Sequence, residues 1–187
     1  MSSRHSIGAM NQLADALDEA GFTPDLVTKL KQYKELEKIK LLLNGCGEVV
    51  QIRHIIDCDA DPFVPDGWKI EKHLKGGKFE WNADKVSLYL SKEQEGGSAI
   101  EGNKLRKKLE KMPVLNANVL DYLLKNPQLI PEDWKGKAVF FWGTIYRCSD
   151  GSLCVRYLYW GGGEWDWGCS WLGDGFLSLC PAAVCAS

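Results

Sequence analysis

Apolar residues recur at helical spacing near the start of the chain. The first apolar face consists of Leu13, Ala16, Leu17 and Ala20. This spacing predicts a helix that ends at Gly21. The segment 23–25 provides a threonine N-cap, a proline at the first helical position and an acid, so we expect a second helix that runs to Asn44-Gly45. Helices this short are marginal alone, so we expect a helical cap on the main domain or, alternatively, a separate docking or oligomerisation element.

After residue 45 the pattern changes to a mixture of strands and helices. Residues 48–56 are rich in β-branched side chains and predict a strand, and 86–90 predict a shorter one. A helix is expected around Leu105 and Leu109. The next helix begins at an Asn116 cap and ends at Asn126-Pro127. The basic residues around Leu105 are interpreted as a solvated helix face.

The last third of the chain has the pattern of strands. We predict three strands over residues 137–147, 153–160 and 164–172, with a hairpin turn at 149–151 and a glycine turn at 161–163. A short terminal strand is expected over residues 182–186. Because so short a strand needs a partner, we expect it to pair with residues 48–56. The order of elements predicts an α+β domain that follows an N-terminal helical segment.

Composition and charge narrow the function classes. Hydrophobic residues make up 45% of the chain and charged residues 26%, which is typical of a globular protein. The net charge of −2 gives no electrostatic reason to expect nucleic-acid binding. No run of 18 apolar residues indicates insertion into a membrane, and no apolar segment of a signal peptide is visible, so we expect folding in the cytoplasm.

The chain has seven cysteines, none of them in a C-x-x-C pair or at zinc-binding spacing. We therefore expect no structural zinc and no disulfide, and we expect Cys46 and Cys58 to be small buried hydrophobes. The run of aspartates at 57, 59 and 61 lacks the glycine and the bidentate glutamate of a calcium loop. No metal and no cofactor are expected. The other cysteines crowd into the tail as Cys148, Cys154, Cys169, Cys180 and Cys185.

The tail offers little for catalysis. The three histidines, His5, His54 and His73, all precede it, and His54 is interpreted as a structural residue. Asp166 and Asp174 form a conceivable carboxylate pair, but the glycines beside them would hold the carboxylates poorly. We therefore expect a binding protein and not an enzyme.

Irregular positions interrupt a regular framework in the tail. The framework is W, W-L, F and P-A-A-V, and we expect Trp142, Trp160 and Trp171 to be core residues. The candidate binding positions are Cys148, Ser152, Cys154, Tyr157, Tyr159, Gly161, Asp166, Gly168, Cys169, Ser170, Gly173, Asp174, Gly175, Leu177, Leu179 and Cys180. Polarity does not explain which residues occupy these positions, but the genetic code does. Replacing the adenines of an asparagine codon, AAY, yields Gly, Cys, Ser, Asp and Leu codons, and one change in a tyrosine codon yields Cys. The last asparagine of the chain is Asn126.

The tail resembles the variable protein of a diversity-generating retroelement, in which a reverse transcriptase rewrites the end of a gene with errors at adenines. The motifs that carry the resemblance are FFWGTIYR, SDG, VRYLYW, WL and PAAV, and upstream NANVLDYLLKNPQLIPEDWKGK. The resemblance is strongest to the archaeal and candidate-phyla branch. It implies a C-type-lectin-like domain over residues 46–187, after a helical segment at 1–45, with a variable region at about 142–187.

The resemblance also implies the binding of a ligand through the variable positions. The ligand is expected to be a protein or another macromolecule, with recognition independent of calcium, because the E-P-N and W-N-D signatures of sugar-binding lectins are absent. One alternative is an oxidase of the formylglycine-generating type on the same fold, which needs a catalytic cysteine pair such as Cys180 and Cys185. Another is a structural component of a cell surface or virion.

Overall fold

The computed structural model describes residues 6–32, 36–47 and 52–186. The chain divides into two compact units, residues 1–51 and 52–187. The described residues form a mixed α+β protein, as predicted. None of its described helices is long and apolar enough to cross a membrane.

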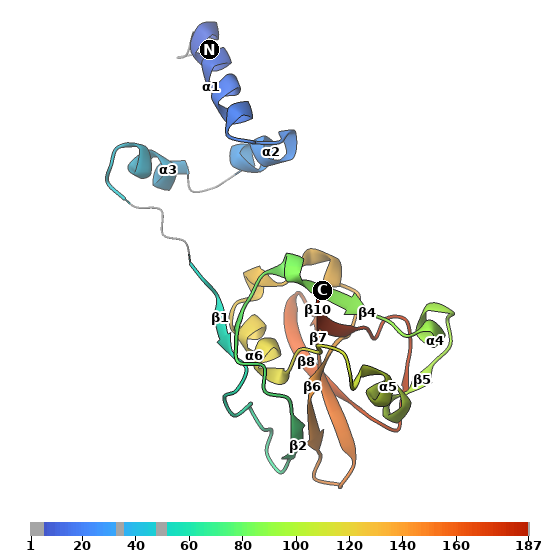
Figure 1. The fold of residues 1–187 in the computed structure, drawn as a ribbon. Helices are drawn as coiled ribbons and strands as arrows, with labels where there is room; N and C mark the ends of the chain where they lie inside the picture. The colour runs from blue at the N-terminus through green and yellow to red at the C-terminus, as the bar shows by residue number, and fades with distance from the viewer. Residues whose placement is uncertain (1–5, 33–35, 48–51, 187) are drawn as a thin grey trace. The chain divides into compact units, whose positions relative to one another are not determined.

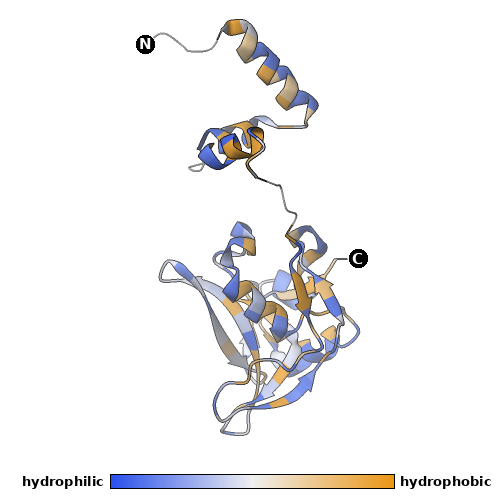
Figure 2. Cartoon of the chain, turned by 90° about the vertical axis from the view of Figure 1, so that its left-hand side faces the viewer, coloured by the Kyte–Doolittle hydropathy of each residue, from blue (hydrophilic) through white to orange (hydrophobic). Residues whose placement is uncertain are grey.

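The described residues of the first unit form the helices α1 (Ile7–Glu19), α2 (Pro24–Gln32) and α3 (Leu36–Leu43). The single helix expected from residue 23 to Asn44-Gly45 is thus described as two, and residues 33–35 between them lie outside the described part of the chain. The predicted boundaries at Gly21 and Pro24 are confirmed: Gly21 has a φ of 79°, and the Thr23 hydroxyl accepts a hydrogen bond from the Leu26 amide. Apolar and polar residues alternate around α1 (Figure 2). Where the structure describes these helices, none of their residues is buried, and Leu13 is 53% exposed. The expectation that Cys46 is buried was wrong, because it is exposed after α3, whereas Cys58 in the second unit is buried as predicted.

The second unit is built on one twisted sheet (Figure 1). Its strands lie in the order β4 (Val86–Tyr89), β10 (Ala182–Cys185), β6 (Val139–Arg147), β7 (Leu153–Gly161) and β8 (Glu164–Trp171), and β2 (Lys69–His73) also pairs with β6. All pairs are antiparallel except β10 with β6. Two small ribbons flank the sheet: β1 (Ile55–Asp57) with β3 (Lys78–Glu80), and β5 (Ile100–Glu101) with β9 (Gly175–Phe176).

Helices cover the sheet, and each side of it has its own core. The helices are α4 (Lys92–Glu95), α5 (Gly102–Leu109) and α6 (Ala117–Lys125), with 3₁₀ turns at Ala83–Lys85, Pro127–Leu129 and Glu132–Trp134. Successive strand residues point to opposite sides, so Phe141 packs with Leu120 of α6 and Phe140 packs with Leu105 of α5. We call these the α6 side and the α5 side.

The predicted three-strand meander and the two helices before it are confirmed. The predicted N-cap is also confirmed, because the Asn116 side chain accepts a hydrogen bond from the Asn118 amide. The strand expected over residues 48–56 is described only as Ile55–Asp57, and residues 48–51 lie outside the described part of the chain. The partner expected for the terminal strand was wrong: β10 lies between β4 and β6, while β1 pairs with β3.

Candidate ligand-binding surface

The loop between β8 and β10 is held by residues that precede the tail. Gln94 is 1% exposed, and its amide nitrogen donates to the carbonyls of Leu177 (3.0 Å) and Cys180 (3.1 Å). At the start of α5, the Gly102 amide donates to the carbonyl of Asp174 at 3.0 Å. The backbone of this loop is therefore positioned without help from the loop's own exposed side chains.

Side chains of the same loop divide into an inward and an outward set. The inward residues are Leu172, Phe176 and Pro181, which are buried and belong to the regular framework of the sequence. The outward residues are the candidate positions Gly173, Asp174, Gly175, Leu177 and Leu179, all exposed, while Cys180 is half-buried. Irregular sequence and exposure therefore coincide at most positions of this loop, and the exposed Ser178 is the one that the sequence did not predict.

A second group of candidate positions shares one side of β7 and β8. Tyr157 lies opposite Gly168, and Tyr159 lies opposite Asp166. The whole group is Tyr157, Tyr159, Gly161, Asp166, Gly168 and Ser170. It lies on the α5 side, where the Tyr157 ring is 4.8 Å from that of Phe140. Burial is the main cause that raises the pKa of the Tyr157 phenol. Each member remains partly or fully exposed.

Cys169 faces the opposite side of β8 from Gly168. The candidate positions of this strand therefore do not form one continuous patch on a single side of the sheet. The register partner of Cys169 is Arg156, on the α6 side. A hollow of about 370 Å³ lies there, lined by Trp68, Cys148, Ser149, Asp150, Cys169, Ser170, Trp171 and Asp174. Because β8 ends the order of strands in the described sheet, both of its sides reach the surface. The candidate positions therefore wrap around β8 instead of covering a single face.

Cys148 and Cys154 form a disulfide, which contradicts the expectation that every cysteine is unpaired. The bond joins the end of β6 to the start of β7 across the hairpin, and both residues are buried, with exposures of 9% and 0%. They pack with Tyr146. Cys154 contributes no exposed surface and Cys148 only its edge in the hollow, so both are removed from the candidate site, whereas Ser152 stays partly exposed in the turn between them.

The framework tryptophans differ in burial. Trp142 is 4% exposed, as predicted for a core residue. Trp160 is half-buried beneath the Lys135 ammonium, which lies 4.0 Å from its ring centroid. Trp171 is 51% exposed, so its assignment to the core was wrong. It is the last residue of β8 and lines the hollow, so it is an exposed aromatic side chain beside the candidate positions.

Comparisons with known proteins give no match. No protein-family model, no curated protein and no solved structure matches this chain. The surface is therefore interpreted from the contacts of this chain alone.

The acids and histidines considered for catalysis have structural partners or lie apart. The Asp166 carboxylate accepts a hydrogen bond from the Trp167 amide at 2.7 Å, whereas Asp174 lines the hollow. His54 bonds the Tyr122 hydroxyl through Nδ1, and His73 bonds Thr144 and a backbone carbonyl. His5 lies outside the described residues. Among the residues that the structure describes, no three His, Cys, Asp or Glu side chains gather as a metal site.

Cys180 and Cys185 do not form a reactive pair. Both are free thiols in the structure. Cys180 packs on the α5 side and Cys185 on the α6 side, so the sheet separates them. Burial raises the pKa of Cys185, which disfavours its thiolate. This geometry gives no support to an oxidase that uses these two cysteines.

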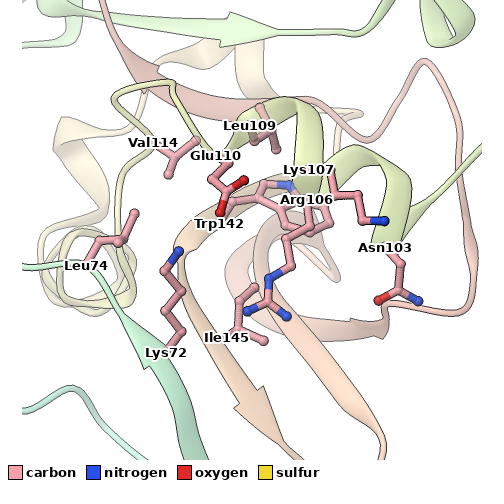
Figure 3. A pocket seen from close by; sticks show the side chains of 10 residues that line it. All are labelled: Lys72, Leu74, Asn103, Arg106, Lys107, Leu109, Glu110, Val114, Trp142 and Ile145. Atoms are coloured by element: carbon pink, nitrogen blue, oxygen red, sulfur yellow. The ribbon is translucent and has the colours of Figure 1, made fainter.

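A basic cavity of about 250 Å³ is lined by none of the candidate positions (Figure 3). Lys72 from β2 and Arg106 and Lys107 from α5 surround its floor of Trp142 and Ile145. Sequence reasoning interpreted Arg106 and Lys107 as a solvated helix face and did not foresee this cavity, because Lys72 is distant in sequence. The Glu110 carboxylate also lines the cavity and offsets part of its positive charge.

Proposed function

We propose that the protein is a ligand-binding protein of the retroelement variable-protein type, with a C-type-lectin-like domain over residues 46–187. The observation that carries the proposal is the division of the β8–β10 loop into buried framework residues and exposed irregular ones. A tail that is rewritten at the irregular positions retains its fold only if those side chains point outward. The diversified ligand site comprises this loop together with the exposed positions of β7 and β8.

The chemistry of this particular variant favours a shallow contact with a macromolecule. Glycine, serine and aspartate occupy most of the exposed positions. The apolar exceptions are Trp171 and Leu177, each 51% exposed, and Leu179, which is 61% exposed. Exposed tryptophan is a frequent anchor in protein interfaces, and the hollow beside Trp171 offers space for a partner side chain. The ligand is a protein or another large molecule that presents a complementary surface.

The first experiment is to sequence the DNA around the gene. The proposal requires an imperfect copy of the tail-coding segment beside a gene for a reverse transcriptase. Mismatches between the copy and the gene should fall at adenines of the copy, and at the codons of the irregular positions. A copy whose mismatches are spread over all four bases would overturn the diversification part of the proposal.

The second experiment compares two libraries of the full chain displayed on phage. One randomises Asp166, Gly173, Asp174, Leu177 and Leu179, and the matched control randomises the buried Leu172, Phe176, Pro181, Ala182 and Ala183. We expect most members of the first library to resist protease and most of the second to be degraded. The first library should also yield binders to lysozyme as a probe target. Folded members without any binder would refute the binding site.

A further inference from the structure

A second cavity, of about 510 Å³, opens on the α6 side of the sheet. Ligand pockets in proteins have volumes of roughly 300–1,000 Å³, so this one is large enough to bind a molecule. Its walls come from β1, the loop that follows it, α6, β7 and β8. None of the irregular tail positions lines it. It is therefore distinct from the candidate ligand-binding surface.

A buried arginine lies in this cavity. Arg156 is 1% exposed, and its Nη2 donates to the Asp121 carboxylate at 2.8 Å. Its guanidinium carbon lies 4.2 Å from the Trp167 ring centroid and 5.2 Å from that of Phe63. One ion pair and two aromatic rings hold the guanidinium in place, because a planar cation is attracted to the faces of aromatic rings.

Several buried polar atoms of the cavity have no hydrogen-bond partner among the described residues. They are Nε and Nη1 of Arg156 and Oδ1 of Asn118. The neighbouring Tyr146 hydroxyl, whose pKa is raised by burial and partly lowered again by Arg156, donates its own hydrogen bond to the Phe63 carbonyl. The Asn118 amide nitrogen is already committed to the carbonyls of Asp57 and Ala60, both at 2.8 Å. Leaving such groups unsatisfied costs about 1–3 kcal/mol each, which favours a partner that satisfies them. The partner must offer an acceptor to Arg156 and a donor to Asn118.

The charges in the cavity favour a neutral partner. Asp121 already balances Arg156, and the remaining charged residues of the lining, Asp57, Asp61 and Lys125, carry a net negative charge, so an added anion meets repulsion. A cation deep in the cavity would be repelled by the buried Arg156 guanidinium. A peptide group is neutral and carries both the acceptor and the donor that are needed. The apolar walls, which include Ile56, Phe63, Tyr122, Leu124 and Trp167, suit an uncharged apolar side chain.

We propose that this cavity binds an extended segment of a partner protein through one apolar residue. Arg156 donates to a carbonyl oxygen of the segment, and Asn118 accepts from one of its N–H groups. The cavity belongs to residues outside the irregular set, so every variant of the tail would retain it. The protein then has one constant partner in addition to a changing ligand. The binding of a segment in this cavity does not depend on diversification of the tail, whereas the contrast between a constant partner and a changing ligand rests on the proposed function.

The experiment titrates the ¹⁵N-labelled full chain with N-acetyl-leucine-methylamide, a neutral leucine flanked by two peptide groups. Saturable shifts are expected at the Arg156 Nε–H and Trp167 indole N–H resonances. N-acetyl-leucine, which carries a carboxylate, should bind at least about tenfold more weakly, a difference of about 1.4 kcal/mol. Tighter binding of the carboxylate would replace the proposal with an anion site. Shifts that do not saturate up to the solubility limit would mean that the cavity holds only water.

A matched pair of variants tests the position of the probe. Phe63 is 53% exposed and lines the cavity, whereas Ile70 on β2 is 40% exposed and does not. Phe63→Ala should weaken probe binding about tenfold and Ile70→Ala should leave it unchanged. Leu124→Ala, on α6, provides an independent second variant should Phe63→Ala misfold. Equal effects of cavity and control variants would overturn the assignment, and the result of the tail libraries would be unaffected because their positions do not line this cavity.

Discussion

Tyr157 lies across Gly168 on the neighbouring strand, so that a β-carbon at position 168 would stand 2.5 Å from the tyrosine ring. The two residues are register partners in the β7–β8 ladder. An aromatic ring laid over a glycine covers backbone that the glycine leaves open. Since the atoms in conflict are at the outer end of a half-buried side chain, Tyr157 is able to turn away when a larger residue arrives.

The relationship predicts a coupling between the two positions. Gly168→Ala should destabilise the protein by about 1 kcal/mol, because Tyr157 leaves its contact with Phe140. In a Tyr157→Ala background the same change should stabilise it by about 0.5 kcal/mol, because alanine is favoured over glycine in a strand. Urea unfolding of the four proteins in this double-mutant cycle measures the coupling. Identical effects in both backgrounds would show that the ring does not rest on Gly168.

Gly102, which supports the β8–β10 loop, and Gly173, which belongs to it, should differ in their tolerance of alanine. A β-carbon on Gly102 would stand 2.6 Å from the Phe176 ring and 2.9 Å from the Leu172 backbone, so Gly102→Ala should cost about 1–3 kcal/mol. Gly173 faces open space and its φ is outside the left-handed region, so Gly173→Ala should change stability by less than about 0.5 kcal/mol. Thermal unfolding of both variants decides this, and similar melting temperatures would contradict the division between support and display.

The tryptophans provide a second matched pair. Trp142→Ala removes a buried side chain from the α5-side core and should cost about 3–5 kcal/mol. Trp171→Ala removes one that is half exposed, so the loss should remain below about 1 kcal/mol. Chemical denaturation of the two variants provides the comparison. A large loss for Trp171→Ala would return this residue to the core and remove it from the proposed ligand surface.

The disulfide predicts a dependence on reductant. Cys148 and Cys154 are six positions apart, and closing so short a loop stabilises a protein by about 2 kcal/mol in the chain-entropy model. Reductant should lower the unfolding free energy of the natural protein by that amount. It should have no effect on the stability of a Cys148→Ala, Cys154→Ala double variant. Mass spectrometry after alkylation under denaturing, non-reducing conditions should show these two cysteines alone protected.

Caps and apolar stripes in the sequence predicted the helices whose determinants lie within a single segment. The Asn116 cap and the apolar stripe through Leu123 are complete within one segment, so the sequence was sufficient to locate α6. The partner of β10 depends on which distant strand reaches it, and no local pattern encodes that. Cys148 and Cys154 flank a short hairpin turn, and this spacing was a signal that could have revealed the bond.

The exposure of the candidate positions was predicted well in the β8–β10 loop and poorly on the strands. Between Leu172 and Pro181, sequence regularity alone distinguished buried from exposed positions. On β8, successive side chains point to opposite sides of the sheet, so Cys169 and Gly168 face different sides. An argument from codons contains no information about this alternation. Arg156 resembles any outward polar residue of a strand. Its burial follows from Asp121 on α6, a contact that exists only after the helix packs on the sheet.

Gln94 and Gly102 hold the backbone of the β8–β10 loop from outside the tail. Both residues precede the stretch proposed to be rewritten, yet they determine where the backbone of the β8–β10 loop runs. Under the proposed diversification, copying errors in the tail would leave Gln94 and Gly102 unchanged. If the tail is diversified as proposed, these two upstream residues and the buried Leu172, Phe176 and Pro181 would keep the shape of the loop, and only the codons of its exposed positions would change what it presents.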